Sequence, residues 1–426
     1  MKILNEYKFL IDDTQPEINP QNGVLFGEGD WLYNLFKDFK RYGRGDVDVD
    51  YTNFVTEYDG SYKFIVQYNC YWHQDWYRAL QNINPKIING LKEGKGKLVF
   101  MNHLEGQPLV SGDSHLNFLE PMYKELNRLE IPPQSIIYLT ANAVADKHHN
   151  DWCVENNITD RMNILGIFTD AIIAQKEATT SRLNNHTFEQ HLNILKNKTN
   201  VKHFIKVQRN DRHFKTIPTH YLWSKGLQDT LYTSHTEYAR HNIGYPTTQD
   251  DKTRDWLFNL LDTKDDFRET LPYTIEETCK EQIKSFDSDR DYTKKIYTLN
   301  LFNMYPSSWP LWKDTCFLRM GLFFHMWEYQ PFLVFGNVGS LQNLKERGYE
   351  TFSEIFDERY DKIEDNGKRL KMVCDELERI SKLPLDECFK LYESVKDKLI
   401  YNRKQLEKNV ELNRLLEFLN VKLFDA

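Results

Sequence analysis

Short apolar runs that alternate with helix-like segments are the feature that most constrains the fold of this chain. Leu98–Met101 and Ser135–Asn142 have the length of buried strands, and a helix-like segment follows each of them. A second series starts at His203–Val207 and includes Phe332–Phe335. Because strands that alternate with helices in this way form βαβ units, we predict an α/β fold with parallel sheets.

The length of the chain predicts more than one domain. Single hydrophobic cores stop growing at roughly 250–300 residues, whereas this chain has 426. We expect a first domain at 1–190, a second at 191–385 and C-terminal helices at 386–426, with a C-terminal helix that returns toward the first domain. The acidic segment 247–291 has no clear periodicity, so we expect it to be an irregular insertion.

Apolar residues spaced by three and four predict two helices near the carboxyl end of the chain. The first set comprises Leu370, Val373, Leu377 and Ile380, and the second, in a highly charged last helix, comprises Val395, Leu399, Leu406 and Val410.

Composition excludes several classes of protein. Acidic residues outnumber basic ones by 63 to 55, a net charge of −8, so no overall attraction to nucleic acid or anionic membrane follows. No run approaches the ~18 apolar residues of a membrane span, and the six cysteines form no CxxC pair. We therefore expect a cytoplasmic protein.

Two other patterns suggest a binding site, but each is better explained without one. Carboxylates alternate in Asp46–Asp50 and Asp287–Asp291, but neither pattern clearly follows a buried strand, and we expect no metal site. Aromatic residues reach 14% and cluster in Tyr68–Tyr77. Such rings can stack on sugars or bases, but we expect them to pack mainly in the core.

A glycine turn follows the apolar run Phe332–Phe335. Its residues are Gly336, Asn337, Gly339 and Ser340. In open parallel sheets, such turns let a backbone approach a phosphate, which the first N–H groups of the next helix can bind. The alternative is an ordinary strand-to-helix turn, because neither a full dinucleotide fingerprint nor a Walker lysine is present.

Charged residues follow two other predicted strands. Arg209 and Arg212, with Lys215 nearby, can converge on a diphosphate, and solvated surface charge is the alternative. His103 and Glu105 follow the strand that ends near Met101 and can serve as a general base; a structural loop is the alternative.

Two stretches of the sequence resemble a known family. They are "HFIKVQRNDRHFK" and, further along the chain, "FLRMGLFFHMWEYQPFLVFGNVGSLQNLKERGYETFSEIFDERYDKIEDNGKRL". From about His203 to Arg414 the chain resembles the carboxyl-terminal half of glycosyltransferase-like proteins of large marine phages and algal viruses. These proteins are distantly similar to the fucosyltransferase and exostosin groups of GT-B glycosyltransferases. The resemblance implies two Rossmann-like domains that face each other across a cleft, in the host cytoplasm if the chain is phage-encoded.

The resemblance also implies an activity and its residues. It implies transfer of a sugar from a nucleoside-diphosphate sugar to a hydroxyl group of a glycan, a protein or a modified DNA base, without a metal or a further cofactor. Arg209 and Arg212 match the family's strand-end arginines, which neutralise the donor diphosphate, and the Gly336–Ser340 turn matches its glycine turn. Glu105 matches an acidic residue of the first domain and is the expected base, with His103 as the substitute.

The sequence departs from the family pattern at one place. Met320 and Gly321 stand where the family usually has a Glu-Lys pair, and only Asn300 stands near the position of a further upstream Glu. Three interpretations follow. Arg319 and His325 supply the donor contacts, the donor is unusual, or the fold is retained as a non-catalytic binding protein or structural component of a virion.

Overall fold

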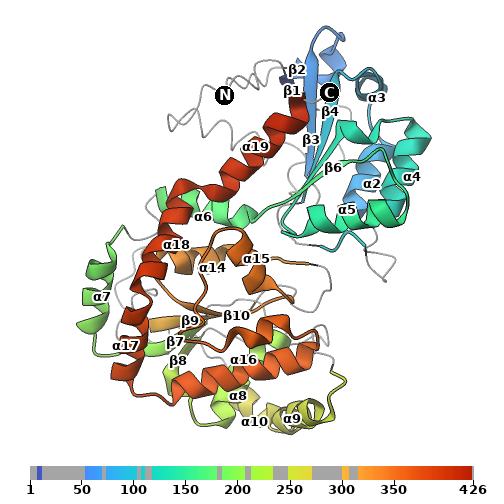
Figure 1. Cartoon of the computed structure of the whole chain (residues 1–426). Helices are drawn as coiled ribbons and strands as arrows, with labels where there is room; N and C mark the ends of the chain where they lie inside the picture. Colours follow the sequence, from blue (N-terminus) through green and yellow to red (C-terminus); the bar gives the residue numbers. More distant parts are fainter. Residues whose placement is uncertain are drawn as a thin grey trace. The chain divides into compact units, whose positions relative to one another are not determined.

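The computed structural model describes ten stretches of the chain. They are residues 7–11, 53–69, 73–102, 107–110, 118–179, 185–206, 213–233, 248–270, 300–306 and 315–424. The chain divides into two compact units, and each is described by itself (Figure 1). The first unit comprises Met1–Thr169 and Glu411–Ala426, and the second comprises Asp170–Val410.

The described part of the first unit contains a six-stranded parallel sheet in the order β2-β1-β3-β4-β5-β6. The strands are β1 (Tyr7–Ile11), β2 (Asn53–Phe54), β3 (Lys63–Asn69), β4 (Gly96–Asn102), β5 (Ile136–Thr140) and β6 (Asn163–Gly166). The helices are α2 (His73–Gln81), α3 (Pro85–Lys92), α4 (Leu119–Leu129), α5 (Ala145–Glu155) and α19 (Val410–Phe424), with 3-10 turns η3 (Val55–Glu57) and η5 (Pro133–Ser135).

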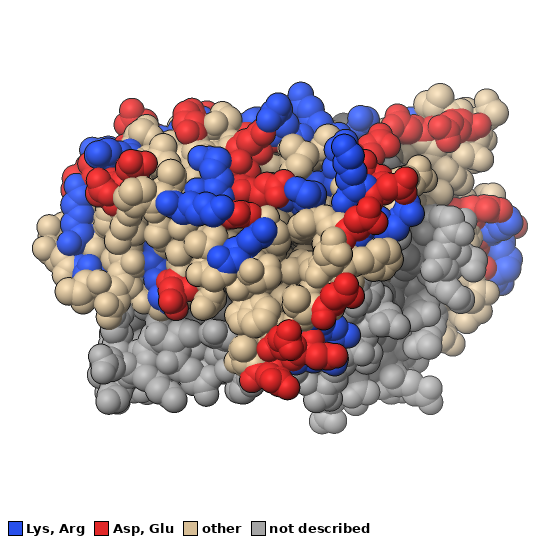
Figure 2. Space-filling model, turned by 90° about the horizontal axis from the view of Figure 1, so that it is seen from below, with Lys and Arg blue, Asp and Glu red and all other residues tan. Residues whose placement is uncertain are grey.

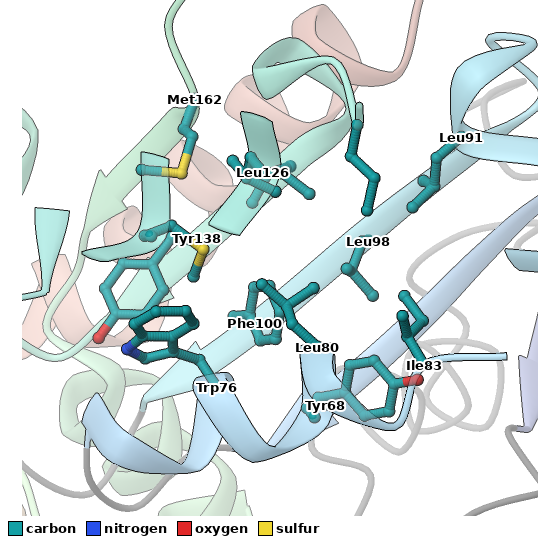
Figure 3. Packing of buried hydrophobic residues seen from close by; sticks show 14 of the residues in the cluster. Tyr68, Trp76, Leu80, Ile83, Leu91, Leu98, Phe100, Leu126, Tyr138 and Met162 are labelled. Carbon is teal, nitrogen blue, oxygen red and sulfur yellow. The ribbon is translucent and has the colours of Figure 1, made fainter. Parts of the chain in front are cut away.

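The core of the first unit lies between one face of this sheet and helices α2 to α5, which share one side of the sheet in Figure 1. Every residue of β4 and β5 is buried, which explains why both strands read as continuous apolar runs. Figure 3 shows Trp76 of α2 and Leu126 of α4 among the side chains that pack with Phe100 and Tyr138. The expected core role of the aromatic cluster is confirmed for Trp76, which is 3% exposed.

The second unit contains a four-stranded parallel sheet in the order β10-β9-β7-β8 among its described residues. The strands are β7 (Lys202–Lys206), β8 (Leu231–Thr233), β9 (Asn300–Pro306) and β10 (Phe332–Phe335). The helices are α6 (Thr169–Thr179), α7 (Phe188–Lys196), α8 (His213–Ser224), α9 (Asp251–Asp262), α10 (Lys264–Glu269), α14 (Met320–Trp327), α15 (Ser340–Glu346), α16 (Asn366–Ser381), α17 (Leu385–Ser394) and α18 (Lys396–Lys408), with η6 (Gln228–Thr230) and η7 (Glu358–Lys362).

Helices cover both faces of the second sheet. Figure 1 shows α14 and α15 on one side and α8 and α16 on the other. The apolar set predicted for α16, Leu370, Val373, Leu377 and Ile380, is entirely buried. Two parallel sheets, each with its own helices, and a helical C-terminal region confirm the predicted α/β class.

The end of the chain differs from the prediction of one last helix. Asn409 has a φ of 57° and separates α18 from α19, so Val410 begins a new helix. Asparagine adopts this left-handed conformation more readily than most residues, which is why it ends helices. As expected, the last helix belongs to the first unit, where Arg414 forms an ion pair of 2.9 Å with Asp146.

Part of the segment expected to be irregular is helical. Asp250 caps α9 by accepting a hydrogen bond from the Thr253 amide, and Leu257 and Leu260 are buried. The high content of acids on the exposed side hides this short amphipathic pattern in the sequence. Residues 271–291 of the same segment lie outside the described part.

The compact units divide the chain at other places than the expected domain limits of 1–190, 191–385 and 386–426. The cysteines that the structure describes as free are buried, namely Cys153, Cys316, Cys374 and Cys388. Among the described helices, none has both the length and the apolar character needed to cross a membrane.

Candidate functional site

Both sheets reverse their strand order at an inner strand. The first unit changes direction between β1 and β3, and the second between β7 and β9. In open parallel sheets, ligands bind beyond the carboxyl ends of the strands at such a switch point, where the loops diverge. A ligand site of this kind therefore corresponds, in the second sheet, to the carboxyl ends of β7 and β9.

Arg209 and Arg212 belong to the connection that leaves this switch point. β7 ends at Lys206 and α8 begins at His213, so the connection starts at the carboxyl end of β7. Both arginines lie outside the described residues. Their place in the chain nevertheless fits the switch point of the second sheet.

Lys215 follows in the first turn of α8. Only 4% of this residue is exposed, so it is not a solvated surface charge. Lysines are rarely buried without partners, and Lys215 takes part in interactions within the chain. Its ammonium group is thus held inside the second unit, close in sequence to the two arginines.

Arg319 lies at the carboxyl end of β9. It is the N-cap residue of α14, and its backbone N–H donates to the Tyr305 hydroxyl at 2.6 Å. Tyr305 is the next-to-last residue of β9 and is 8% exposed. The Arg319 guanidinium lies 5.5 Å from the centre of the Phe317 ring. Arg319 therefore shares the carboxyl edge of the sheet with the β7–α8 connection.

The glycine turn after β10 has a closely fixed shape. A Cβ atom on Gly336 would lie 2.4 Å from Ser340 Oγ, and Gly339 has a φ of 75°, so both positions favour glycine. Ser340 Oγ donates to the Asn337 carbonyl at 2.7 Å, and Asn337 Nδ2 donates to Thr315 Oγ1 at 2.6 Å. The turn is thus a packed element at the same edge of the sheet.

The backbone donors at the start of α15 are bound by Asp361 of the same chain. The Leu341 and Gln342 amides donate to its two carboxylate oxygens at 3.0 and 3.1 Å, and the Gly339 amide donates to its carbonyl at 2.8 Å. Burial raises the pKa of Asp361, although the two amide bonds act in the opposite direction. A carboxylate of the protein therefore takes the position at which a donor phosphate was expected.

Arg369 holds the turn from the other side. This residue of α16 is 1% exposed, and its Nε donates to the Gly336 carbonyl at 3.1 Å. Its Nη1 donates to the Ile363 carbonyl at 2.6 Å, and its Nη2 donates to Asn366 Oδ1. The end of β10 is therefore fixed by residues that lie some distance along the chain.

His325 lies at the opposite end of the sheet, near the point where β9 begins. Its Nδ1 forms a hydrogen bond with Gln330 Oε1, and Gln330 Nε2 donates at 3.4 Å to the carbonyl of Asn300, the first residue of β9. His325 is 3% exposed, and burial lowers its pKa to about 3. The structure does not bring it together with Arg319.

The residues expected to act as a base, His103 and Glu105, lie outside the described residues, but both flanks of their segment are described. Asn102 ends β4 in the interior of the first sheet, and its Nδ2 donates to Gln107 Oε1 at 3.4 Å. Asn142, which follows β5, donates through Nδ2 to the Gln107 carbonyl at 3.2 Å. Both flanks of the segment therefore belong to a cluster of buried polar side chains at the carboxyl ends of β4 and β5.

Sequence reasoning missed the residues that support these positions. Asn102 and Asn142 had a local signal, because each is a polar residue at the end of a buried apolar run. Asp361 and Arg369 had none, since their partners in the glycine turn are many residues away. No group of His, Cys, Asp or Glu suited to a metal ion occurs among the described residues, and both Asp-x-Asp patterns lie outside them.

Comparison with known proteins gives similarity in structure only. No protein-family model and no curated protein matches the chain. A trehalose 6-phosphate synthase from Burkholderia multivorans is 12% identical with a TM-score of 0.42, covering 92% of this chain and 77% of that one. An Escherichia coli structure described as trehalose-6-phosphate bound with UDP-2-fluoro glucose is 12% identical with a TM-score of 0.43, covering 84% and 73%.

A third solved structure is similar to the same degree. The N-terminal domain of Candida albicans trehalose-6-phosphate phosphatase is 11% identical with a TM-score of 0.42, covering 85% of this chain and 71% of that one. At these values the likeness says nothing about the ligand or the reaction of this chain.

Proposed function

We propose that the chain is a glycosyltransferase that moves a sugar from a nucleoside-diphosphate sugar to a hydroxyl acceptor. The observation that carries this proposal is the switch point between β7 and β9. The connection with Arg209 and Arg212 leaves the sheet there, and Arg319 lies at the end of the neighbouring strand. Sequence resemblance to glycosyltransferase-like proteins supports the same function.

The basic residues have an electrostatic role in this reaction. Arginine binds phosphate oxygens through two parallel N–H bonds, so Arg209 and Arg212 hold the donor diphosphate and stabilise the charge that develops on it as it departs. Lys215 and Arg319 add positive charge at the same edge. The turn at Gly336–Ser340 shapes the floor of the site, while its first helical N–H groups stay bound to Asp361. His325 is left out of the donor set.

Glu105 removes the proton from the attacking hydroxyl in this proposal, with His103 as the substitute base. Its segment starts at the carboxyl end of β4, and the hydrogen bond between Asn102 and Gln107 ties the two flanks of that segment together. The proposed base thus belongs to the first unit and the proposed donor site to the second.

The proposed acceptor is a glycan, a protein or a modified DNA base, of the kinds that a phage-encoded enzyme meets. Figure 2 shows Lys and Arg side chains interspersed with Asp and Glu on the face viewed. Since DNA binding is driven largely by contacts of basic residues with phosphates, that face offers no continuous basic surface for a duplex. Acceptor binding that falls steeply with salt would identify DNA as the acceptor, whereas binding that ignores salt would argue against it.

A thermal-shift screen against UDP, GDP, CMP and their sugar conjugates tests the donor site. A ligand at ~100 times its dissociation constant stabilises a fold by about 2.7 kcal/mol. Arg209→Ala should weaken binding of the stabilising nucleotide by about tenfold to a hundredfold, since a hydrogen bond to a charged group contributes about 1.5–3 kcal/mol. Arg268→Ala is the matched control, because Arg268 is an exposed arginine of the same unit paired with Asp265.

Two results would contradict the proposal. One is the absence of a shift with every nucleotide for a well-folded protein, which would favour a non-catalytic binding role. The other is an unchanged dissociation constant in both Arg209→Ala and Arg212→Ala. Glu105→Gln separates binding from transfer, because it should keep donor affinity and lose sugar transfer.

A further inference from the structure

The first unit has a pocket that the proposed reaction does not use. It has a volume of about 640 Å³, which is within the range of roughly 300–1,000 Å³ of small-molecule sites. Its lining comes from α5, from α19 and from Arg161–Leu165, which lead into and form most of β6. β6 is an edge strand of the described sheet, so its outer side has no strand partner there. Its described lining contains none of the described residues of the proposed donor site, such as Lys215, Arg319 or Ser340.

Among the described residues of this lining, cations outnumber acids. The cations are Arg161, Arg414 and Lys422, and the acids are Asp146 and Glu417. Arg414 is engaged by Asp146 at 2.9 Å. Lys422 has no ion-pair partner within the described stretches, and Glu417 is exposed. The pocket therefore presents Arg161 and Lys422 to a ligand, with one solvent-exposed acid nearby.

Two hydrogen bonds hold Arg161, which lies just before the first residue of β6. Its Nε donates to the Ile158 carbonyl at 3.2 Å, and its Nη1 donates to Asn150 Oδ1 at 3.4 Å. A guanidinium has five N–H donors, so these two bonds leave donors for a ligand. Because both bonds lead to neighbouring backbone or α5, the group loses little freedom when it binds an anion.

His149 adds a donor of fixed orientation. The Tyr123 hydroxyl lies 3.0 Å and the Cys153 thiol 3.3 Å from its Nε2. Both groups can donate to Nε2, and in the tautomer that uses Nε2 as the acceptor the ring hydrogen is on Nδ1. His149 lines the pocket while its Nε2 edge is turned to the core. The Nδ1–H edge is thus the one available to the pocket.

Tyr123 fixes this arrangement from the core. Its hydroxyl oxygen accepts a hydrogen bond from the Met162 amide at 3.0 Å, which orients the phenol for donation to His149. Burial, and next the charge of Arg161, lower the pKa of His149 to about 4. The imidazole is therefore neutral at pH 7 and acts as a hydrogen-bond donor rather than as a further cation.

Apolar residues complete the pocket. Met162, Ile164 and Leu165 belong to β6 or directly precede it, and Phe418 and Val421 belong to α19. Val421 is 45% exposed, which is high for a valine at a packed helix. Apolar surface beside cationic donors matches a ligand with an anionic head and an apolar body.

We propose that the pocket between α5, β6 and α19 binds a small organic anion. Its phosphate or carboxylate head contacts Arg161, Lys422 and the Nδ1–H of His149. Its apolar body lies against the residues of β6 and against Phe418 and Val421. Its described lining shares no residue with the described part of the proposed donor site, so its ligand is an effector rather than the nucleotide donor.

Isothermal titration of the full chain, without any sugar donor, tests this site. The probes are phenyl phosphate and benzoate, with inorganic phosphate and benzyl alcohol as probes that lack the apolar body or the charge. We expect one organic anion to bind in a 1:1 ratio, at least tenfold more tightly than both of the latter. The tighter of the two organic anions identifies the head group.

Two variants with opposite expected effects accompany the titration. Lys422→Ala should weaken binding at least fivefold, because it removes a cation that has no other partner in the described chain. Glu417→Gln should tighten binding, because it removes the nearby negative charge. Lys404→Ala, an exposed lysine of α18 in the second unit, should change nothing. Melting temperatures of all variants establish that they are folded.

Three results would overturn the proposal. The first is the absence of saturable binding of either organic anion by the folded protein at 10 mM probe, a concentration on the order of ten times a millimolar dissociation constant. The second is an affinity that neither Lys422→Ala nor Glu417→Gln alters. The third is equal affinity for inorganic phosphate or benzyl alcohol, which would mean that the pocket does not combine a charged and an apolar contact.

Discussion

At the scale of single residues, the buried pair Asp361 and Arg369 fixes the turn after β10. Asp361 accepts the amides at the start of α15, and Arg369 donates to the carbonyl of Gly336 in the turn and to that of Ile363, which follows η7. Burial lowers the pKa of Arg369 to about 10, so the guanidinium stays charged at neutral pH. Each group also compensates part of the charge of the other. Removing either side chain would leave buried polar groups without a hydrogen-bond partner.

Arg369→Met should destabilise the second unit by about 3–5 kcal/mol, the cost of removing one member of a buried charged network. The methionine fills the space, but the Gly336 and Ile363 carbonyls lose their donor. Denaturant unfolding measures the change in the free energy of unfolding. Arg359→Ala is the control, because Arg359 is an exposed residue of η7 whose ion pair in the described part of the chain is with Asp357. A loss for Arg369→Met no larger than for the control would contradict this role.

At the scale of elements, α16 depends on the cap at its first turn. Asp365 accepts the Lys368 amide at 2.8 Å, and it also accepts the Gln249 amide and the Thr248 hydroxyl, each at 2.9 Å. One carboxylate thus caps α16 and fastens the residues that lead into α9. Burial alone would raise the pKa of Asp365, but these hydrogen bonds outweigh it and hold the pKa below its usual range.

Asp365→Ala should lower the free energy of unfolding by about 1–2 kcal/mol, as expected for the loss of an N-cap. Asp365→Asn is the matched control, because asparagine caps a helix nearly as well and lacks only the charge. Since the folded pKa is lowered, the stabilisation is complete above the unfolded value of about 3.9 and is lost as the pH falls below it. Urea unfolding at pH 7 tests the prediction, and equal losses in both variants would contradict the capping role.

At the scale of the whole molecule, the buried histidines with a strongly lowered pKa are distributed unevenly between the described parts of the two units. The first unit contains His149, with a pKa of about 4, and the second contains His191, His220 and His325, with values of about 3, 4 and 3. Burial is the main cause of each decrease. All four are neutral in the folded chain, whereas the unfolded chain takes up protons near pH 6.5.

The second unit should therefore lose stability first as the pH falls below about 6.5, by up to about 1.4 kcal/mol per pH unit for each histidine. The stabilisation is complete above that pH and is lost toward the folded values of about 3 to 4. Hydrogen exchange with mass spectrometry from pH 7.5 to 5 follows each unit separately. His220→Gln should reduce the slope for the second unit alone. Equal acid sensitivity of both units would contradict the prediction.

Sequence patterns predicted the strands and the helical face of α16 because continuous burial leaves a continuous apolar signal. β4, β5 and β10 are buried along their whole length, and each was predicted as a strand. The connection that contains Arg209 and Arg212 follows β7 at a switch point of the described sheet, but the two residues themselves lie outside the described part. Side-chain pairings over long sequence distances left no such signal, so the contact of Asp361 with α15 was not predictable. The break at Asn409 was missed because its apolar spacing continues across it.

The membership of α19 in the first unit has a consequence for the order in which this protein can be built during translation. Domains generally fold from the amino terminus as the ribosome releases them. Here the ion pair of Arg414 with Asp146, and the bond of the Phe168 amide to the Glu411 carboxylate at 2.9 Å, require residues made after the entire second unit. During translation, the surface of the first unit that contacts α19 therefore stays uncovered until the second unit has been synthesised.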